Sequence, residues 1–145
     1  MTQPQKCERC GKGLSKDRIA KRKKACYLCE KAIAREKSEA AHDKRVCAMY
    51  GLRPGEYKQL YEAQGGKCAV KGCPARGLAL RLAVDHDHDI GLHNRNAVRG
   101  LLCKRHNRTI GDAGDDPEVF ESMANYLRHP PAWKILGTHA NSSGT

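Results

Sequence analysis

Val84-Asp85-His86-Asp87-His88 is the most informative segment of this sequence. The residues leading into it from Leu80 are largely apolar and end in the β-branched Val84, which predicts a strand. Three acids and two imidazoles then fall within residues 85–89. Charges this dense repel one another unless they are exposed or bind a cation, so packing does not explain them. The stretch therefore predicts a metal-dependent site.

A calcium-binding loop is one alternative for this stretch, because Asp85, Asp87 and Asp89 alternate as the first ligands of such a loop do. Its sixth position needs a glycine and its twelfth a glutamate. Here these positions hold Ile90 and Asn96, which excludes the calcium loop.

The segment after this loop predicts a second strand, over 98–102, with Arg99 projecting from it. A short helix should follow, from about Cys103 to Gly111. At 100° per residue, one face of that helix would carry Cys103, His106, Asn107 and Ile110. The opposite face would carry Lys104, Arg105 and Arg108, which with Arg99 are candidate phosphate contacts.

Four residues around this helix have the spacing of a zinc site: Cys68, Cys73, Cys103 and His106. Three thiolates and one imidazole make a closed tetrahedral site, which is structural rather than catalytic. The alternative is that His106 is an ordinary surface histidine. Bound zinc would fix a helix too short to be stable alone, and would hold Asn107 facing the strand end at Asp85 and His86.

A second cysteine set lies near the N-terminus, where Cys7, Cys10, Cys26 and Cys29 form two Cys-x-x-Cys pairs. This spacing predicts a four-thiolate zinc module over residues 1–29. Its role stays open between a purely structural module and one that grips DNA. The candidate phosphate contacts here are Lys21, Arg22, Lys23 and Lys24. Cys47 has no metal partner in this scheme and is expected to be a small apolar residue.

Composition and charge limit the class of protein. Of 145 residues only 5% are aromatic and 30% are charged, so the apolar core would be thin and metal ions would compensate. The net charge of +11 divides into +8 for residues 1–50, +6 for 51–110 and −3 for 111–145. A basic excess around the cysteines favours a polyanion such as DNA as partner. Solubility alone is the plainer alternative.

The compartment decides between zinc and disulfides. No apolar signal segment follows Met1, and no run approaches the roughly 20 apolar residues of a membrane helix. We therefore expect a cytoplasmic chain with no membrane association and with reduced thiols. In that setting the paired cysteines favour zinc.

The rest of the chain predicts mainly helices. Residues 30–50 should form a basic connecting helix with a sparse apolar stripe at Ile33, Ala40 and Cys47. A second, larger domain would follow over 51–132. Near its end Asp116 should cap a helix that has Pro117 at its first position. The buried stripe expected on that helix consists of Phe120, Met123, Ala124 and Leu127. Residues 133–145 should be a flexible tail.

Three segments recur in the order found in a known family. They are Leu60-Tyr-Glu-Ala-Gln-Gly-Gly-Lys-Cys68, the stretch from Val84 to His88, and Val98-Arg-Gly-Leu-Leu-Cys103 continued to Asn107. With them the chain resembles the phage recombination endonuclease VII family, a branch of the His-Me finger (HNH-like) nucleases, over roughly residues 55–130. The resemblance implies a ββα-metal finger, divalent-ion dependence and cutting of branched DNA. A phage origin would place the chain in the cytoplasm of a host cell.

The resemblance also implies roles for four residues. Asp85 and Asn107 would ligate the catalytic ion, His86 would be the general base, and His88 would assist. The chain departs from the family's pattern at His106, which stands where a second Cys-x-x-Cys pair typically ends. It also has an N-terminal zinc module and lacks a long C-terminal helical extension, so junction specificity does not carry over; a homodimer stays open.

The chemistry agrees with these roles. An imidazole can deprotonate water near neutral pH, and a cation at the scissile phosphate stabilises the added charge. A carboxylate and an amide oxygen suit Mg²⁺ or Mn²⁺, whereas the cysteines suit two structural Zn²⁺ ions. We expect a small, zinc-stabilised α+β protein that is a metal-dependent DNA endonuclease. The alternatives are a non-catalytic zinc-dependent nucleic-acid-binding protein, a structural protein, and catalytic zinc held by Asp85, His86 and His88.

Overall fold

The computed structural model describes residues 5–77 and 80–137. The chain divides into two compact units, Met1–Tyr57 and Lys58–Thr145, and the division falls within helix α3 (Glu56–Ala63). The described residues form helices and a two-stranded antiparallel sheet, so that the expected α+β class is confirmed. None of the described helices is both long and apolar enough to cross a membrane.

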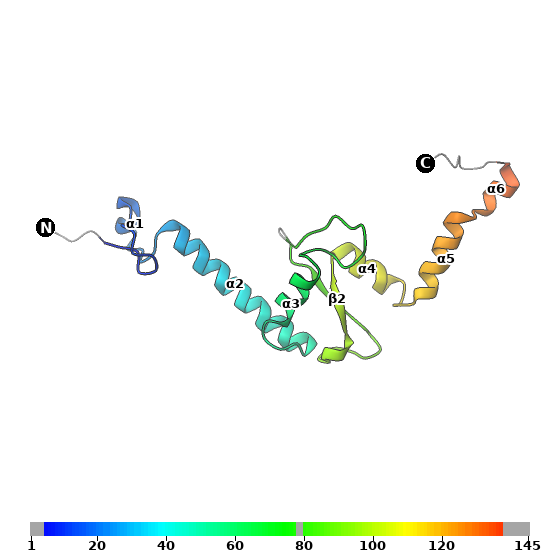
Figure 1. Cartoon of the computed structure of the whole chain (residues 1–145), viewed down its shortest axis with the longest axis horizontal. Coiled ribbons are helices and arrows are strands. Elements are labelled where there is room, and N and C mark those ends of the chain that lie inside the picture. The colour runs from blue at the N-terminus through cyan, green and yellow to red at the C-terminus, as the bar shows by residue number, and fades with distance from the viewer. Residues whose placement is uncertain (1–4, 78–79, 138–145) are drawn as a thin grey trace. The chain divides into compact units, whose positions relative to one another are not determined.

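The first unit contains helix α1 (Lys16–Ala20) and the long helix α2 (Tyr27–Tyr50), which runs without a break in Figure 1. The helix expected over 30–50 therefore forms and begins already at Tyr27. It ends at Gly51, whose φ of 69° is the left-handed conformation that glycine adopts without strain. The Gly51 N–H donates to the carbonyl of Cys47 at 3.0 Å, which closes the last turn.

The buried side of α2 differs from the expected stripe. Ala40 is exposed, and the buried residues of the helix are His42 and Val46. The Gly55 N–H donates to the Asp43 carboxylate at 3.0 and 3.2 Å, and the His42 ring lies edge-on to Tyr57 with centroids 4.5 Å apart. The segment after Gly51 thus folds back along α2, and this contact, rather than hydropathy, selects the covered side.

The second unit is built on strands β1 (Ala83–His86) and β2 (Val98–Leu102), which pair antiparallel with Ala83 opposite Leu102. A short 3-10 helix, η1 (Arg95–Ala97), precedes β2, and helix α4 (Lys104–Asp112) follows it. The predicted second strand is confirmed. The predicted first strand also forms and ends with Asp85 and His86, so these two side chains project from the sheet itself.

A β-bulge interrupts the pairing at the functional end of the sheet. Asp85 lies opposite Gly100, but His86 lies opposite Val98, which leaves Arg99 as an extra residue on β2. Bulges change the direction of a side chain and are common beside active sites. Here the bulge directs the guanidinium of Arg99 to the carboxylate of Asp85.

The core of this unit is small and is formed mostly by residues on or next to the two strands. Its buried apolar residues are Cys68, Leu82, Val84, Ala97, Leu101 and Leu102. The side chain of Gln64, just beyond α3, accepts the Leu101 N–H at 2.8 Å and donates to the Leu101 carbonyl at 2.8 Å. Its amide nitrogen also donates to the carbonyl of Lys67 at 2.9 Å. Gln64 therefore pairs with β2 as a neighbouring strand would.

Replacing Gln64 by alanine is expected to destabilise this unit by about 1–3 kcal/mol, because it leaves the buried N–H of Leu101 without a partner and removes one of the two donors to its carbonyl. Urea unfolding monitored by circular dichroism measures the change. The matched control is Gln59→Ala, on the exposed side of α3, which should change stability by less than about 0.5 kcal/mol. Equal effects of the two substitutions would contradict the role given to Gln64.

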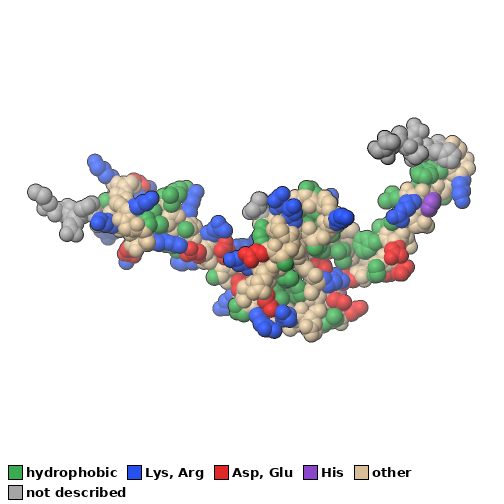
Figure 2. Space-filling view, viewed as in Figure 1, with side chains coloured by type: hydrophobic (Ala, Val, Ile, Leu, Met, Phe, Trp, Pro, Cys, Tyr) green, Lys and Arg blue, Asp and Glu red, His purple; other side chains and the backbone are tan. Residues whose placement is uncertain are grey.

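Two helices follow the core, α5 (Pro117–Arg128) and α6 (Pro131–Leu136). The predicted cap is confirmed, since the Asp116 carboxylate accepts the Glu118 N–H at 2.8 Å. The predicted burial of α5 is wrong: none of its residues is buried, and Met123 and Leu127 are 56% and 70% exposed. Figure 2 shows apolar side chains at the surface of α5 beside acidic ones.

The reason for this error is general. An amphipathic pattern indicates which side of a helix is apolar, but it does not supply a surface that covers that side. The stripe of Phe120, Met123, Ala124 and Leu127 is apolar and nevertheless not buried in this unit. A flexible tail was expected over 133–145. Residues 133–136 of that segment are helical and belong to α6, and 138–145 lie outside the described residues.

Candidate metal centres and active site

The structure brings Cys68, Cys73, Cys103 and His106 together, with their ligand atoms all within 4.8 Å of one another. The sulfurs of Cys73 and Cys103 are 3.9 Å apart. Nδ1 of His106 lies 3.4 Å from the Cys68 sulfur and 3.5 Å from that of Cys103. His106 thus faces the thiols through a single ring nitrogen, as a ligand does.

These spacings fit tetrahedral zinc. Zn–S bonds of about 2.3 Å and Zn–N bonds of about 2.0–2.1 Å at tetrahedral angles place two sulfurs about 3.8 Å apart, and a sulfur and a nitrogen about 3.5 Å apart. A disulfide would need sulfurs only about 2.0 Å apart, and all eight cysteines are free thiols. The cluster can therefore hold a zinc ion with no vacant position for a substrate.

The local backbone explains how the four ligands converge. The Cys73 N–H donates to the carbonyl of Val70 at 3.1 Å, and the Ala69 N–H donates to the carbonyl of Leu101 at 3.0 Å, which ties the cysteine turn to β2. Cys103 is the N-cap of α4, and its sulfur accepts the His106 N–H at 3.5 Å. Burial would raise the pKa of the Cys103 thiol, but this bond and neighbouring thiols lower it.

The first unit holds a second cluster, in which the sulfurs of Cys7, Cys10, Cys26 and Cys29 also lie within 4.8 Å of one another. Cys10 and Cys26 are 3.8 Å apart, again the tetrahedral spacing. The neighbouring thiols raise the pKa of Cys29 to about 12, but backbone hydrogen bonds at Cys26 and Cys10 lower the pKa of Cys7 to about 6, which favours the thiolate. This is the form that binds zinc.

The basic residues beside this cluster are mostly paired with acids. Lys21 lies 3.0 Å from Asp17, Lys23 lies 2.9 Å from Glu30, and Lys24 lies 3.6 Å from Glu8. Arg22 is exposed and has a φ of 50°. All four positions expected to contact phosphate are therefore on the surface, but the positive charge of the three lysines is partly balanced.

The acid–imidazole stretch forms one connected cluster with two residues from elsewhere. Asp85 is only 8% exposed, and Arg99 donates to its two oxygens from Nε at 2.8 Å and from Nη2 at 3.0 Å. The same Nη2 donates to Asp115 at 3.0 Å, and the other Asp115 oxygen lies 2.6 Å from Nδ1 of His88. The rings of His86 and His88 are 4.7 Å apart.

Helix α4 carries the remaining predicted site residue. It contacts both β1 and β2, so Asn107 lies on the helix that packs against the strand of Asp85 and His86. The predicted faces of α4 are confirmed by burial. The half-buried residues are Cys103, His106, Asn107 and Ile110, and the exposed ones include Lys104, Arg105 and Arg108.

Two features of this cluster were not expected from the sequence. Arg99 was expected to contact phosphate, yet its guanidinium lies between two carboxylates, which raise its pKa above the usual value. Asp115 was not singled out from the sequence, because an acid that follows a glycine in a turn gives no local sign of a long-range contact. The available sign in the sequence was Arg99 itself, because a charged residue in an otherwise apolar strand needs an acid nearby.

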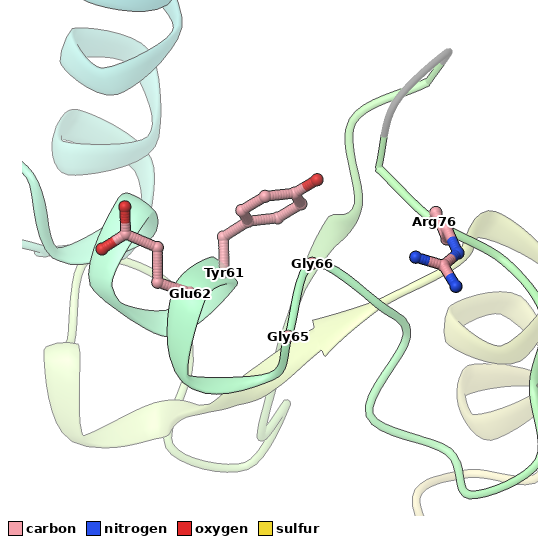
Figure 3. A pocket seen from close by; sticks show the side chains of 5 residues that line it. All are labelled: Tyr61, Glu62, Gly65, Gly66 and Arg76. Atoms are coloured by element: carbon pink, nitrogen blue, oxygen red, sulfur yellow. The ribbon is translucent and has the colours of Figure 1, made fainter.

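A separate shallow pocket lies at the end of α3, lined by Tyr61, Glu62, Gly65, Gly66 and Arg76. Figure 3 shows the Tyr61 ring pointing away from α3 past Gly66, whereas the side chain of Glu62 points to the opposite side of the helix. A side chain at Gly66 would meet the Tyr61 hydroxyl at 3.0 Å, and one at Gly77 would meet the ring at 2.6 Å. The two glycines thus make room for the tyrosine.

Comparisons with known proteins place this geometry in a family. Residues 43–129 match the family described as recombination endonuclease VII, which covers the Cys68 cluster, the sheet and α4 and excludes the Cys7 cluster. The chain is 40% identical over 114 residues to the Gene 59 protein of Mycobacterium phage L5, and 39% identical over 114 residues to that of Mycobacterium phage D29.

Each alignment covers 77% of this chain and 65% of the relative, so the chain spans about two-thirds of the length of the relatives it matches. No solved structure is significantly similar to it. Because the family match extends over more than half of the chain and contains the whole acid–imidazole cluster, the chain belongs to the recombination endonuclease VII family.

Proposed function

We propose that the chain is a DNA endonuclease that hydrolyses phosphodiester bonds with one divalent ion, Mg²⁺ or Mn²⁺, in a ββα-metal (His-Me) finger. The finger consists of β1, β2 and α4. The observation that supports this best is the cluster at its sheet end, where the buried carboxylate of Asp85 is linked through Arg99 and Asp115 to His88, whose ring lies 4.7 Å from that of His86. A protein that only binds nucleic acid does not need acids and imidazoles together at its binding site, and the acids would repel the phosphates.

The donor set suits the proposed ion. Asp85 and Asn107 offer a carboxylate and an amide oxygen, which are the hard ligands that Mg²⁺ and Mn²⁺ prefer. Asp85 is buried and needs a cation beside it; in the structure this is the guanidinium of Arg99. Each Asp85 oxygen accepts one bond from Arg99 and keeps a further lone pair with which it can bind an ion.

The bound ion and the residues of the chain have separate roles in the proposed reaction. The divalent ion, when bound, supplies positive charge for the phosphate and for the leaving 3′-oxygen. His86, at the end of β1, accepts a proton from the attacking water, and His88 beside it assists. Zinc at the two cysteine clusters holds each unit in shape and takes no part in the reaction.

Nicking of supercoiled plasmid tests the proposal directly. We expect nicked product with Mg²⁺ or Mn²⁺ and none after EDTA treatment followed by restoration of Zn²⁺ alone. Absence of nicking with every divalent ion, in a chain that still binds the plasmid, would instead support the non-catalytic nucleic-acid-binding protein. Four-way, flapped and linear duplexes compared side by side would then identify the preferred DNA structure.

The exposed basic face of α4 is expected to contact DNA phosphates. The double substitution Lys104→Ala and Arg108→Ala should reduce the slope of log affinity against log salt by about 1.8, since each lost phosphate contact contributes about 0.9. The control removes the same charge from exposed positions off α4, with Lys58→Ala and Lys71→Ala. Equal slopes for the two double variants, measured by fluorescence anisotropy, would rule out this face.

A further inference from the structure

Asp115 lies in the turn after α4, in a conformation that few residues adopt. Its φ is 60°, the left-handed region, where a residue other than glycine is strained, although Asp and Asn tolerate it best. Its N–H donates to the carbonyl of Ile110 at 3.1 Å, and the Gly114 N–H donates to that of Gly111 at 2.9 Å. These bonds turn the chain back against the end of α4 and fix where Asp115 is placed.

The two carboxylate oxygens of Asp115 serve two different strand ends. One accepts from Nη2 of Arg99 at 3.0 Å, on the bulge of β2. The other accepts from Nδ1 of His88 at 2.6 Å, just beyond β1, and lies 3.4 Å from the His88 N–H. The Asp115 side chain is only 15% exposed, whereas the side chain of His88 is 63% exposed, so the carboxylate is shielded and the imidazole faces solvent.

The charge state of Asp115 determines the form of His88. Burial would raise the pKa of this carboxyl, but the bonds from Arg99 and His88 lower it to about 2. An ionised carboxylate only accepts hydrogen bonds. Nδ1 of His88 must therefore carry the hydrogen, and in the neutral ring the lone pair is left on Nε2.

We propose that Asp115 is a positioning residue that holds His88 as the Nδ1–H tautomer and keeps Arg99 beside Asp85. This deepens the proposed nuclease function, on which its catalytic consequence rests. Because Arg99 has a second acceptor in Asp115, its place does not depend on Asp85 alone. The same contact anchors the C-terminal end of α4, while the Cys103–His106 cluster anchors the other end.

The anchoring has a consequence for Asn107. A nine-residue helix is marginal by itself, and one fixed at a single end would still swing. With zinc ligands at its first turn and Asp115 just past its last, α4 is held at both ends against the sheet. Catalytic groups must be held to within about 0.5 Å, and two anchors meet this need better than one.

The tautomer of His88 can be read by two-bond ¹⁵N–¹H correlation NMR on the full zinc-loaded chain, with the ring assigned by His88→Gln. Two variants keep the backbone turn: Asp115→Gly adopts positive φ freely, and Asp115→Asn is isosteric and tolerates it. The control is Asp116→Asn, which makes the same charge change one residue away and preserves the α5 cap.

We expect the Nδ1–H form in the native chain and in Asp116→Asn, a redistribution towards Nε2–H in Asp115→Gly, and an intermediate result in Asp115→Asn, whose amide oxygen can still accept. Cleavage should follow the same order, with kcat about 10- to 100-fold lower in Asp115→Gly and KM nearly unchanged. Zinc content and melting temperature, measured in parallel, identify any variant that has lost its fold.

Unchanged His88 nitrogen signals in both folded Asp115 variants would overturn the proposal. An altered tautomer with unchanged kcat would overturn its catalytic part. The NMR readout needs no cleavage, so it decides the role of Asp115 even if the native chain cuts no DNA, and the two failures are distinguishable.

Discussion

Replacing His86 by alanine is expected to lower the rate of DNA cleavage by roughly 10²- to 10⁴-fold, the contribution of a positioned general base. His86 ends β1 next to the buried Asp85, and its ring lies 4.7 Å from that of His88. Removing the imidazole leaves the attacking water without a proton acceptor but takes no ligand from either cysteine cluster. Binding of DNA and zinc content should therefore stay close to native.

Single-turnover cleavage under saturating protein measures this effect without a contribution from product release. The control is His129→Ala, an exposed histidine just after α5, which should cut at the native rate. Native cutting by His86→Ala would remove His86 from the mechanism. A loss of one metal ion from His86→Ala would show instead that the imidazole is a ligand, as in the alternative with catalytic zinc.

Replacing Cys68 by alanine is expected to unfold the second unit. Its buried apolar core is small, and structural zinc in comparable small modules contributes on the order of 10–16 kcal/mol. Without zinc, the start of α4 loses its link to the Cys68–Cys73 turn, and Asn107 loses its fixed place. Cleavage should disappear together with the folded signal in circular dichroism.

Metal analysis tests this prediction by measuring the number of zinc ions per chain. The two clusters predict two zinc ions per chain, and Cys68→Ala should retain one, in the Cys7 cluster. The control is Cys47→Ala. Cys47 lies half-buried on α2 and belongs to neither cluster, so this variant should keep both zinc ions. Because ligands bind as thiolates, zinc should be released as pH falls. A chain that stays folded and active after complete removal of zinc would refute this scheme.

The sequence predicted the cysteine clusters and α4 better than the covered sides of α2 and α5, because the clusters and α4 are tied to ligand spacing. Cysteines and histidines that bind one ion must converge, so Cys68, Cys73, Cys103 and His106 were identified without coordinates. The faces of α4 followed from helical periodicity once those ligands were fixed. On α2 the hydropathy pattern was weak, and the covered side followed from a loop that folds back onto His42.

Local spacing along the chain is enough to identify the two cysteine clusters, the strand–loop–strand–helix order and the residues that project from these elements. Coordinates were needed to find that Arg99 lies between two carboxylates, that Asp115 contacts His88 and that Gln64 pairs with the edge of β2. These contacts join residues 14 to 37 positions apart. A one-residue bulge places Arg99, and a left-handed turn places Asp115. Neither feature can be recognised from the periodicity of the sequence.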